Sequence, residues 1–202
     1  MSKNKPQLQY FLLYKPFNVL CQFTDSSNTK RTLAEVYPFP KNVYPVGRLD
    51  TDSEGLLILT NDKTLNHRLL NPQFAHKRTY WVQVEGIPTA EALKQLKQGV
   101  EIKVGTKMYR TKTAQVTLLK KEPNVPDRDP PIRFRQNQPT SWLELTLTEG
   151  KNRQVRKMTA KVGFPTLRLI RASIEGLTIE GMEAGQVLKV SKNTLERKVF
   201  LL

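Results

Sequence analysis

The fold is organised around the stretch Val46-Gly47-Arg48-Leu49-Asp50-Thr51-Asp52-Ser53-Glu54-Gly55-Leu56-Leu57-Ile58-Leu59-Thr60-Asn61-Asp62. An apolar approach at Val43 and Tyr44 leads into a short acidic turn, and a wholly apolar run of strand length follows at 56–59. This pattern predicts a strand, a polar turn and a second, buried strand. It places Asp50 at the end of a buried element.

The acidic turn is open to three interpretations. The acids could simply be solvated in a turn between two strands. They could form a calcium loop, because Asp50, Asp52 and Glu54 alternate; however, the EF-hand template requires Asp or Asn at position 54 and a bidentate Glu where Asn61 stands. They could instead hold a carboxylate nucleophile. The chain carries a formal charge of +15, which would keep Asp50 ionised and attract polyanions.

The charge balance points to nucleic acid as the partner. Lys and Arg total 33 against 18 Asp and Glu, and the excess runs through the whole sequence instead of a tail. Neutralising phosphates releases counterions and gives affinity that does not depend on base sequence. A basic surface without a partner is the alternative.

Composition also excludes several classes of protein. No window approaches the roughly 18 unbroken apolar residues of a membrane span, and no signal peptide begins the chain. Cys21, His67 and His76 are too few for a disulfide framework or a structural metal site, and they make Cys/His or Ser/His hydrolase chemistry improbable. We therefore expect a cytoplasmic, globular protein without a metal, and a monomer by default.

Periodicity predicts more strands than helices. Helices are expected at 32–36, from a cap at 61 or 62 to 70, from Thr89 to Gly99, and from Asn152 to Gly163. The last ten residues read as a basic, poorly specified tail. The two kinds of element alternate without a strict βαβ period, so the expected class is α+β, a mixed, largely antiparallel sheet with flanking helices. Strands are expected at 10–14, 19–23, 77–84, 100–104, 113–119, 142–147, 167–170 and 177–179.

Two basic segments each have a structural and a functional interpretation. The helix after Asn152 presents three cations on one face, which could be solvated or could bind a phosphate or a buried carboxylate: Arg153, Arg156 and Lys157. The Pro-rich connection 121–140, which holds Arg133 and Arg135, could be a solvated loop or could contact RNA.

The central stretch resembles the catalytic motif of the ribosomal RNA pseudouridine synthases. That motif joins Gly-Arg-Leu-Asp, a short acidic turn, Gly-Leu-Leu and Leu-Thr-Asn-Asp, which stand here at 47–50, 55–57 and 59–62. The resemblance covers nearly the whole chain. Its other parts are Lys15-Pro16, Tyr44-Pro45-Val46, Lys77-Arg78-Thr79-Tyr80, residues 149–158, residues 167–171 and Gly176-Leu177.

The branch that this chain resembles contains small-subunit synthase A and large-subunit synthases B, E and F. Most of its members carry an N-terminal RNA-binding domain of the S4 type, which we expect this chain to lack. Because of this expected absence and of the Pro-rich loop, the chain most resembles the synthase E group. Residues 1–8 read as a flexible lead. The resemblance implies a catalytic domain over 9–202, either as one body or as two lobes around a central cleft.

The resemblance implies that a uridine of ribosomal RNA, expected to be 23S, is converted to pseudouridine without a cofactor. It makes Asp50 the catalytic carboxylate. Arg156 would pair with Asp50, and Arg153 is the second choice for that role. Tyr80 would stack on the extruded base, with its hydroxyl near the proton that leaves C5.

The same resemblance supplies the rest of the expected site. Leu177 would form a pocket wall against the uracil, and Arg48 of the motif would support the site. The expected RNA contacts are Lys151, Arg153, Lys157, Arg133 and Arg135. A non-catalytic RNA-binding or ribosome-assembly protein is the alternative, because charge and loops alone would suffice for it.

Overall fold

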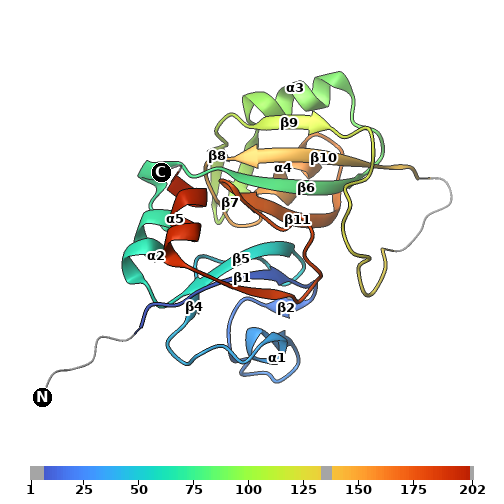
Figure 1. The fold of residues 1–202 in the computed structure, drawn as a ribbon. Coiled ribbons are helices and arrows are strands. Elements are labelled where there is room, and N and C mark those ends of the chain that lie inside the picture. The colour runs from blue at the N-terminus through green and yellow to red at the C-terminus, as the bar shows by residue number, and fades with distance from the viewer. Residues whose placement is uncertain (1–6, 133–137, 201–202) are drawn as a thin grey trace, which may run out of the picture.

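The computed structural model describes residues 7–132 and 138–200. Most of the expected N-terminal lead, and the expected RNA contacts Arg133 and Arg135, lie outside these residues. The described residues form one large sheet, two small sheets and flanking helices (Figure 1).

The large sheet has nine strands in the order β13-β1-β5-β11-β6-β10-β9, with β12 paired to β11 and β4 paired to β5. Neighbouring strands are antiparallel except at the centre, where β5 and β11 are parallel. The expected mixed, largely antiparallel sheet is confirmed. The strands are β1 (Tyr10–Lys15), β4 (Tyr44–Pro45), β5 (Glu54–Thr60), β6 (Arg78–Glu85), β9 (Gln115–Leu118), β10 (Thr140–Leu147), β11 (Thr166–Ile174), β12 (Leu177–Thr178) and β13 (Val187–Val190).

Two pairs of short strands stand apart from this sheet. They are β2 (Val19–Leu20) with β3 (Arg31–Thr32), and β7 (Glu101–Val104) with β8 (Lys107–Arg110). The helices lie at both ends of the large sheet: α3 and α4 beside the half made by β6, β9, β10 and β11, and α2 and α5 next to one another beside the other half (Figure 1). They are α1 (Leu33–Val36), α2 (Lys63–Leu70), the 3-10 helix η1 (Pro72–Phe74), α3 (Ala90–Gln98), α4 (Gln154–Lys161) and α5 (Lys192–Phe200).

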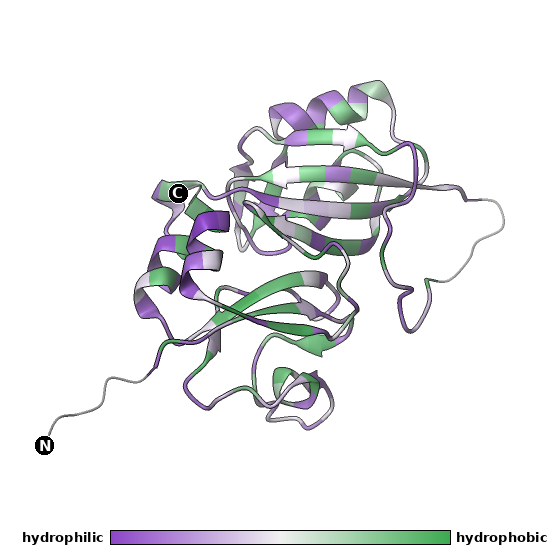
Figure 2. Cartoon of the chain, viewed as in Figure 1, coloured by the Kyte–Doolittle hydropathy of each residue, from purple (hydrophilic) through white to green (hydrophobic). Residues whose placement is uncertain are grey.

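The apolar run of the central stretch is buried on both faces of the sheet. All seven residues of β5 are buried, and β1 beside it is buried throughout. One face of the two strands packs with β11, α2 and α5, and the other packs with Leu33 of α1 and Phe39. Figure 2 shows β1 and β5 as hydrophobic along most of their length, whereas β6 and β10 are banded as strands with one more polar face.

Side-chain caps fix the beginnings of α2 and α3 as the sequence predicts. The Asp62 carboxylate accepts hydrogen bonds from the backbone N–H groups of Thr64 and Leu65, at 3.0 and 3.1 Å, and so starts α2. The Thr89 hydroxyl accepts from the N–H of Ala92 at the start of α3. No described helix has the length and apolar character needed to cross a membrane.

The C-terminal segment, which the sequence presents as a basic, poorly specified tail, forms helix α5 over residues 192–200. Its apolar signal is short: Leu195 and Val199 are buried, and Phe200 at its end is partly buried against the same core. The Ser191 hydroxyl accepts from the N–H of Thr194 at 3.0 Å and caps the helix. Strands β8 and β13, also absent from the prediction, are four residues each and mostly exposed, so they carry little apolar pattern.

Candidate active site

The acidic turn between Leu49 and β5 is held from beneath by a buried lysine. The N–H of Ser53 donates to the carbonyl of Asp50 at 3.0 Å, which closes the turn. Lys15, at the end of β1, is completely buried, and its Nζ donates to the carbonyls of Pro16 at 2.8 Å and Thr51 at 3.4 Å. Burial lowers the pKa of Lys15 to about 8. The backbone of the turn is therefore held by the ammonium group of a lysine that is largely desolvated by the core.

A glycine brings the turn against β11. Gly55 has a φ of +105°, and a Cβ at this position would lie 2.3 Å from the backbone oxygen of Arg171. Only glycine permits this approach, which pairs Glu54 and Gly55 in parallel with Ile170 and Arg171. As a result, the end of the acidic turn and the middle of β11 are fixed relative to one another.

A buried ion pair fixes the start of β5. Nε and Nη2 of Arg168 donate to the two carboxylate oxygens of Glu54, each at 2.8 Å, and Nη2 also donates to the carbonyl of Pro126 at 2.8 Å. The side chains are only 7% and 3% exposed. Although burial opposes it, the hydrogen bonds to Glu54 raise the pKa of Arg168. This pair ties β5, β11 and the Pro-rich connection together.

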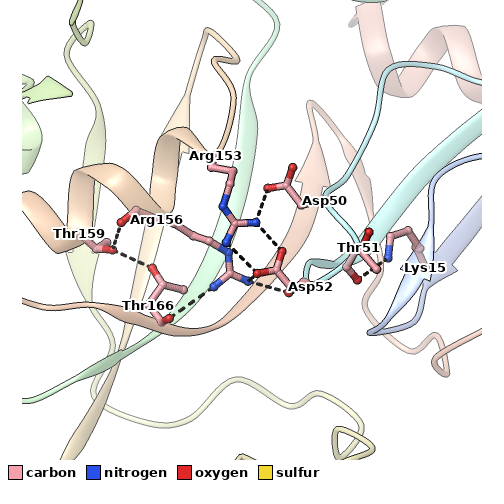
Figure 3. Close-up of polar contacts among 8 residues, drawn as sticks. All are labelled: Lys15, Asp50, Thr51, Asp52, Arg153, Arg156, Thr159 and Thr166. Carbon is pink, nitrogen blue, oxygen red and sulfur yellow. Dashed lines mark hydrogen bonds and ion pairs between the residues drawn. The ribbon is translucent and has the colours of Figure 1, made fainter. Parts of the chain in front are cut away.

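Asp52 binds two arginines of the α4 segment (Figure 3). Nη1 and Nη2 of Arg153 donate to its two carboxylate oxygens at 2.9 and 2.8 Å. Nη2 of Arg156 donates to the Asp52 carbonyl at 2.6 Å and lies 3.4 Å from its Oδ2. The hydrogen bonds from Arg153 hold the pKa of the Asp52 carboxyl below its usual range, while partial burial opposes them.

Asp50 is paired with Arg153, not with Arg156. Oδ2 of Asp50 lies 3.7 Å from Nη1 of Arg153, and the Asp50 side chain is one-third exposed at 33%. The first-choice prediction, a direct Arg156–Asp50 pair, is therefore wrong, and the second choice, Arg153, is the partner observed. Asp52 is the physical reason, because it takes up Arg156 through both its carbonyl and its carboxylate.

An unusual backbone conformation directs Arg153 toward the acidic turn. Arg153 is the N-cap of α4 with φ 52° and ψ 35°, in the left-handed region that non-glycine residues seldom adopt. The residue after it, Gln154, is buried and donates through Nε2 to Glu149 at 2.7 Å. Glu149 also accepts from the hydroxyl of Tyr109 and from the N–H of Lys112, at 2.5 and 2.9 Å, so the loop before α4 is fixed to the β7–β8 hairpin.

These elements surround a cleft of about 490 Å³. This volume is in the range of pockets that enclose small ligands, about 300–1,000 Å³. Asp50 and Tyr80 both line it, Tyr80 from β6, where it is the cross-strand neighbour of Arg171. The cleft is electropositive, because six cations of the described residues line it against the carboxylates of Asp50 and Glu149: Arg48, Arg78, Lys112, Lys151, Arg153 and Arg171.

The other predicted site residues lie at different places. Arg48 is exposed and lines the cleft, and Lys151 lines it on the α4 side, where its Nζ lies 4.7 Å from the centre of the Tyr109 ring. Lys157 is half-buried beyond the cleft, and its Nζ lies 3.5 Å from Oδ1 of Asn152. Leu177 is in the hydrophobic core and does not line the cleft, so its predicted role as a pocket wall is not supported. Leu169 and Ile174 supply apolar lining instead.

The part of the chain that the structure describes contains no group of three His, Cys, Asp or Glu side chains that could hold a metal ion. The alternating acids of the turn point to different partners: Asp52 binds arginines, and Glu54 is buried against Arg168. The calcium-loop interpretation therefore has no geometric support.

The sequence model of one protein family matches this chain. It is described as RNA pseudouridylate synthase and covers residues 9–161, which include Asp50, Tyr80 and the whole of α4. The chain belongs to the RNA pseudouridine synthase family.

Several curated synthases are similar to this member over most of its length. Ribosomal large subunit pseudouridine synthase E of Xanthomonas axonopodis pv. citri is 55% identical over 164 residues, which are 81% of this chain and 84% of the relative. The protein of the same name from Vibrio vulnificus is 49% identical over 94% of this chain and 78% of its own length. Synthase B of Bacillus subtilis is 32% identical over 93% of this chain and 70% of its own length.

A solved pseudouridylate synthase has the same fold. Its crystal structure superposes with a TM-score of 0.76 at 25% identity, and the match covers 96% of this chain and 74% of the solved chain. The family, the branch and the α+β synthase fold expected from the sequence motifs are confirmed.

Three residues of this synthase site were not expected from the sequence. The sequence interprets Asp52 only as a solvated acid of the turn or as a calcium ligand, and Lys15 and Arg171 only as parts of the family resemblance. The signal for Asp52 was its place two residues after Asp50. For Arg171 it was a charged residue within a strand that is otherwise buried.

Proposed function

We propose that this synthase isomerises a uridine of large-subunit ribosomal RNA to pseudouridine, with Asp50 as the catalytic carboxylate. The observation that carries the proposal is the position of Asp50: one-third exposed, paired with Arg153, and in the same cleft as Tyr80. The names of the most similar curated relatives support the large ribosomal subunit as the source of the substrate.

The reaction requires little beyond a well-placed carboxylate. The N1–C1′ bond breaks, C1′ joins C5 of the same uracil, the C5 hydrogen leaves as a proton, and N1 gains one. Because no net oxidation takes place, no cofactor is needed. An ionised Asp50 could attack the sugar, attack the uracil ring or remove a ribose proton, and Arg153 stabilises the ionised carboxylate in each case.

The cleft walls suit a flipped nucleotide. Tyr80 offers an aromatic face on which an extruded uracil can stack, and its hydroxyl would lie near the departing C5 proton. Extruding the base costs a few kcal/mol of stacking and pairing energy. Contacts between phosphates and the cations Arg48 and Lys151 at the cleft, and Lys157 beyond it, would offset this cost.

The supporting roles follow from the contacts around Asp52. Arg153 is shared between Asp50 and Asp52, so we assign it the role of positioning the catalytic carboxylate instead of binding phosphate. Arg156 holds the backbone of the same turn through the Asp52 carbonyl and acts on Asp50 indirectly. We further propose that the protein works in the cytoplasm as a monomer, which light scattering coupled to size-exclusion chromatography would test.

The alternative is an RNA-binding or ribosome-assembly protein without catalysis. Measuring tritium release to water separates the two functions, using ribosomal RNA labelled at C5 of uridine from cells that lack this protein. Wild type, Asp50→Asn and Asp25→Asn are compared; Asp25 is a matched control because it lies in an exposed loop outside the cleft.

We expect release by wild type and Asp25→Asn, no release by Asp50→Asn, and similar RNA affinity for all three. Release by Asp50→Asn at the wild-type rate would remove Asp50 from catalysis. A lack of release by wild type from both free RNA and ribosomal particles would favour the binding protein.

A further inference from the structure

A second arginine of β11, Arg171, lies in the wall of the cleft. It is 4% exposed and is the direct cross-strand neighbour of Tyr80, on which the uracil is proposed to stack. Its Nε donates to the carbonyl of Leu56 at 2.8 Å, which fixes the guanidinium against β5. Side chains of directly opposite residues in a sheet lie about 4.5–5.5 Å apart at Cβ, so this cation is beside the proposed position of the base.

The fold itself does not use the charge of Arg171. Among the described residues no carboxylate forms an ion pair with it, and its buried Nη2 has no hydrogen-bond partner. Arg168, three positions earlier in the same strand, is comparably buried but forms two hydrogen bonds with Glu54. A buried N–H without a partner costs stability, more so for a charged group.

Two other features of the same cleft point to an absent polar ligand. The hydroxyl of Ser53, in the acidic turn, is buried and has no partner in the described structure. Among the described residues Arg78 donates hydrogen bonds only to the backbone carbonyls of His76 and Leu69. Burial, together with the nearby Arg171 charge, lowers its pKa, and the Glu175 charge opposes this shift. The cleft wall therefore carries two cations, and no carboxylate of the described residues forms an ion pair with either of them.

The proposed reaction places negative charge where these groups are. If Asp50 attacks C1′ or removes a ribose proton, the N1–C1′ bond breaks and its electron pair leaves with the uracil as an anion. If Asp50 attacks C6 of the ring, the electrons move toward C5 and O4. All three routes increase the negative charge on a uracil carbonyl oxygen, which a preorganised donor in a dry site would stabilise.

We propose that Arg171 is a catalytic residue that donates a hydrogen bond to a carbonyl oxygen of the extruded uracil and stabilises the charge that develops there. The charge is transient: when C5 bonds to C1′, the ring electrons form the new bond, and the C5 proton then leaves to a base. Arg171 exchanges no proton in these steps. The proposal rests on the proposed function, because it requires a uracil in the cleft.

The test combines variants of Arg171 with altered bases. Large-subunit RNA is transcribed with uridine, 4-thiouridine or 2-thiouridine, because sulfur accepts hydrogen bonds less well than oxygen. Single-turnover isomerisation at saturating protein is followed by nuclease digestion and mass spectrometry of the separated nucleosides. The proteins are wild type, Arg171→Met, Arg171→Lys, and Arg168→Lys as a buried control of the same strand that lies outside the cleft lining.

We expect Arg171→Met to slow the uridine reaction about 100-fold to 1,000-fold, as for loss of one oxyanion donor. The ratio of the oxo to the thio rate should also change between wild type and Arg171→Met, by about tenfold or more, at one of the two oxygens. Arg168→Lys should leave both ratios as in wild type, even if it lowers stability. Since every protein receives the same RNAs, misfolding of the thio transcripts cancels from the comparison.

Several outcomes would overturn the assignment. Ratios that stay the same in Arg171→Met for both thio RNAs would make Arg171 a structural residue, whatever its effect on rate. If circular dichroism shows that Arg171→Met is not folded, the oxo-to-thio rate ratios of Arg171→Lys are compared with those of wild type instead. If wild type does not isomerise the uridine RNA, the proposed function fails instead, and the two failures are thereby distinguished.

Discussion

Two carboxylate–arginine pairs, only two residues apart in the central stretch, have nearly the same geometry and different surroundings. Arg153 binds Asp52 through two hydrogen bonds of 2.9 and 2.8 Å, and Arg168 binds Glu54 through two of 2.8 Å. The first pair is 41% and 37% exposed, whereas the second is 7% and 3% exposed. Hydrogen-bond geometry alone therefore does not reveal what a pair does.

The difference in exposure separates a fixed anchor from an adjustable contact. Glu54 and Arg168 are almost completely shielded from solvent, so their pair holds β5 to β11. Arg153 can exchange Asp52 for water, for a phosphate or for Asp50, which already lies 3.7 Å from its Nη1. Asp52 therefore belongs to the reactive part of the site, whereas Glu54, two residues later, stabilises the fold.

The strongest test of this comparison removes the carboxylate of each pair. Glu54→Ala should lower the free energy of unfolding by about 3–5 kcal/mol, because it leaves the Arg168 cation buried and unpaired. Asp52→Ala should cost at most about 1 kcal/mol, because the Asp52–Arg153 pair is exposed and Arg156 keeps its hydrogen bond to the backbone carbonyl of residue 52. Urea unfolding measures both values; equal losses would contradict the separation.

The architecture could be predicted where one local pattern determined it. The run Leu56-Leu57-Ile58-Leu59 is buried on both faces, and the caps Asp62 and Thr89 start helices as expected. Helix α5 could not be predicted in the same way, because it is stabilised by contacts far away in the sequence. Its Lys198 carbonyl, for example, accepts a hydrogen bond from the N–H of Gly176.

The sequence predicts which residues belong to the site, but it does not predict which of them form ion pairs with one another. Motifs supplied Asp50, Tyr80 and the cations of α4, which lie in distant segments that the sheet brings to one cleft. Which arginine meets Asp50 depends on the left-handed conformation of Arg153, and helical periodicity from 152 onward does not contain that information.

The lysine beneath the acidic turn provides a test that depends on pH. The pKa of Lys15 is about 8 in the folded protein and has its ordinary value of 10.5 after unfolding, so between these values the unfolded chain binds more protons. Its contribution to stability should therefore rise with pH across this window, by about 2–3 kcal/mol, and stay constant below pH 8.

The measurement is urea unfolding of wild type and Lys15→Met at several pH values from 7 to 10.5. The difference in unfolding free energy between the two proteins isolates the lysine from other groups that titrate in this range. A difference that does not change with pH would mean that Lys15 is not desolvated in the folded protein.

Asp52→Asn tests the contact between Asp52 and Arg153, because it removes the negative charge and keeps the size of the side chain. The amide binds the two arginines more weakly, so Arg153 should move toward Asp50 or toward RNA phosphates. We expect single-turnover rates to fall about tenfold to 100-fold, in the range reported for small displacements of catalytic groups. RNA affinity should stay equal or increase, which simple unfolding of the site would not produce. Asp25→Asn again serves as the matched control.

The smallest effect distinguishes two neighbouring cations of α4. Arg156 is engaged with the Asp52 backbone, whereas the one polar contact of Lys157 within the described residues is at 3.5 Å from Asn152, which leaves its ammonium group available to a phosphate. Lys157→Ala should therefore leave the single-turnover rate at saturating RNA nearly unchanged and reduce the slope of log affinity against log salt by about 0.7–0.9. Arg156→Ala should reduce the rate and leave the slope as it is. If both variants lose rate to the same extent, or both change the slope, then α4 acts as a phosphate-binding surface only, and the contact between Arg156 and Asp52 has no part in holding Asp50.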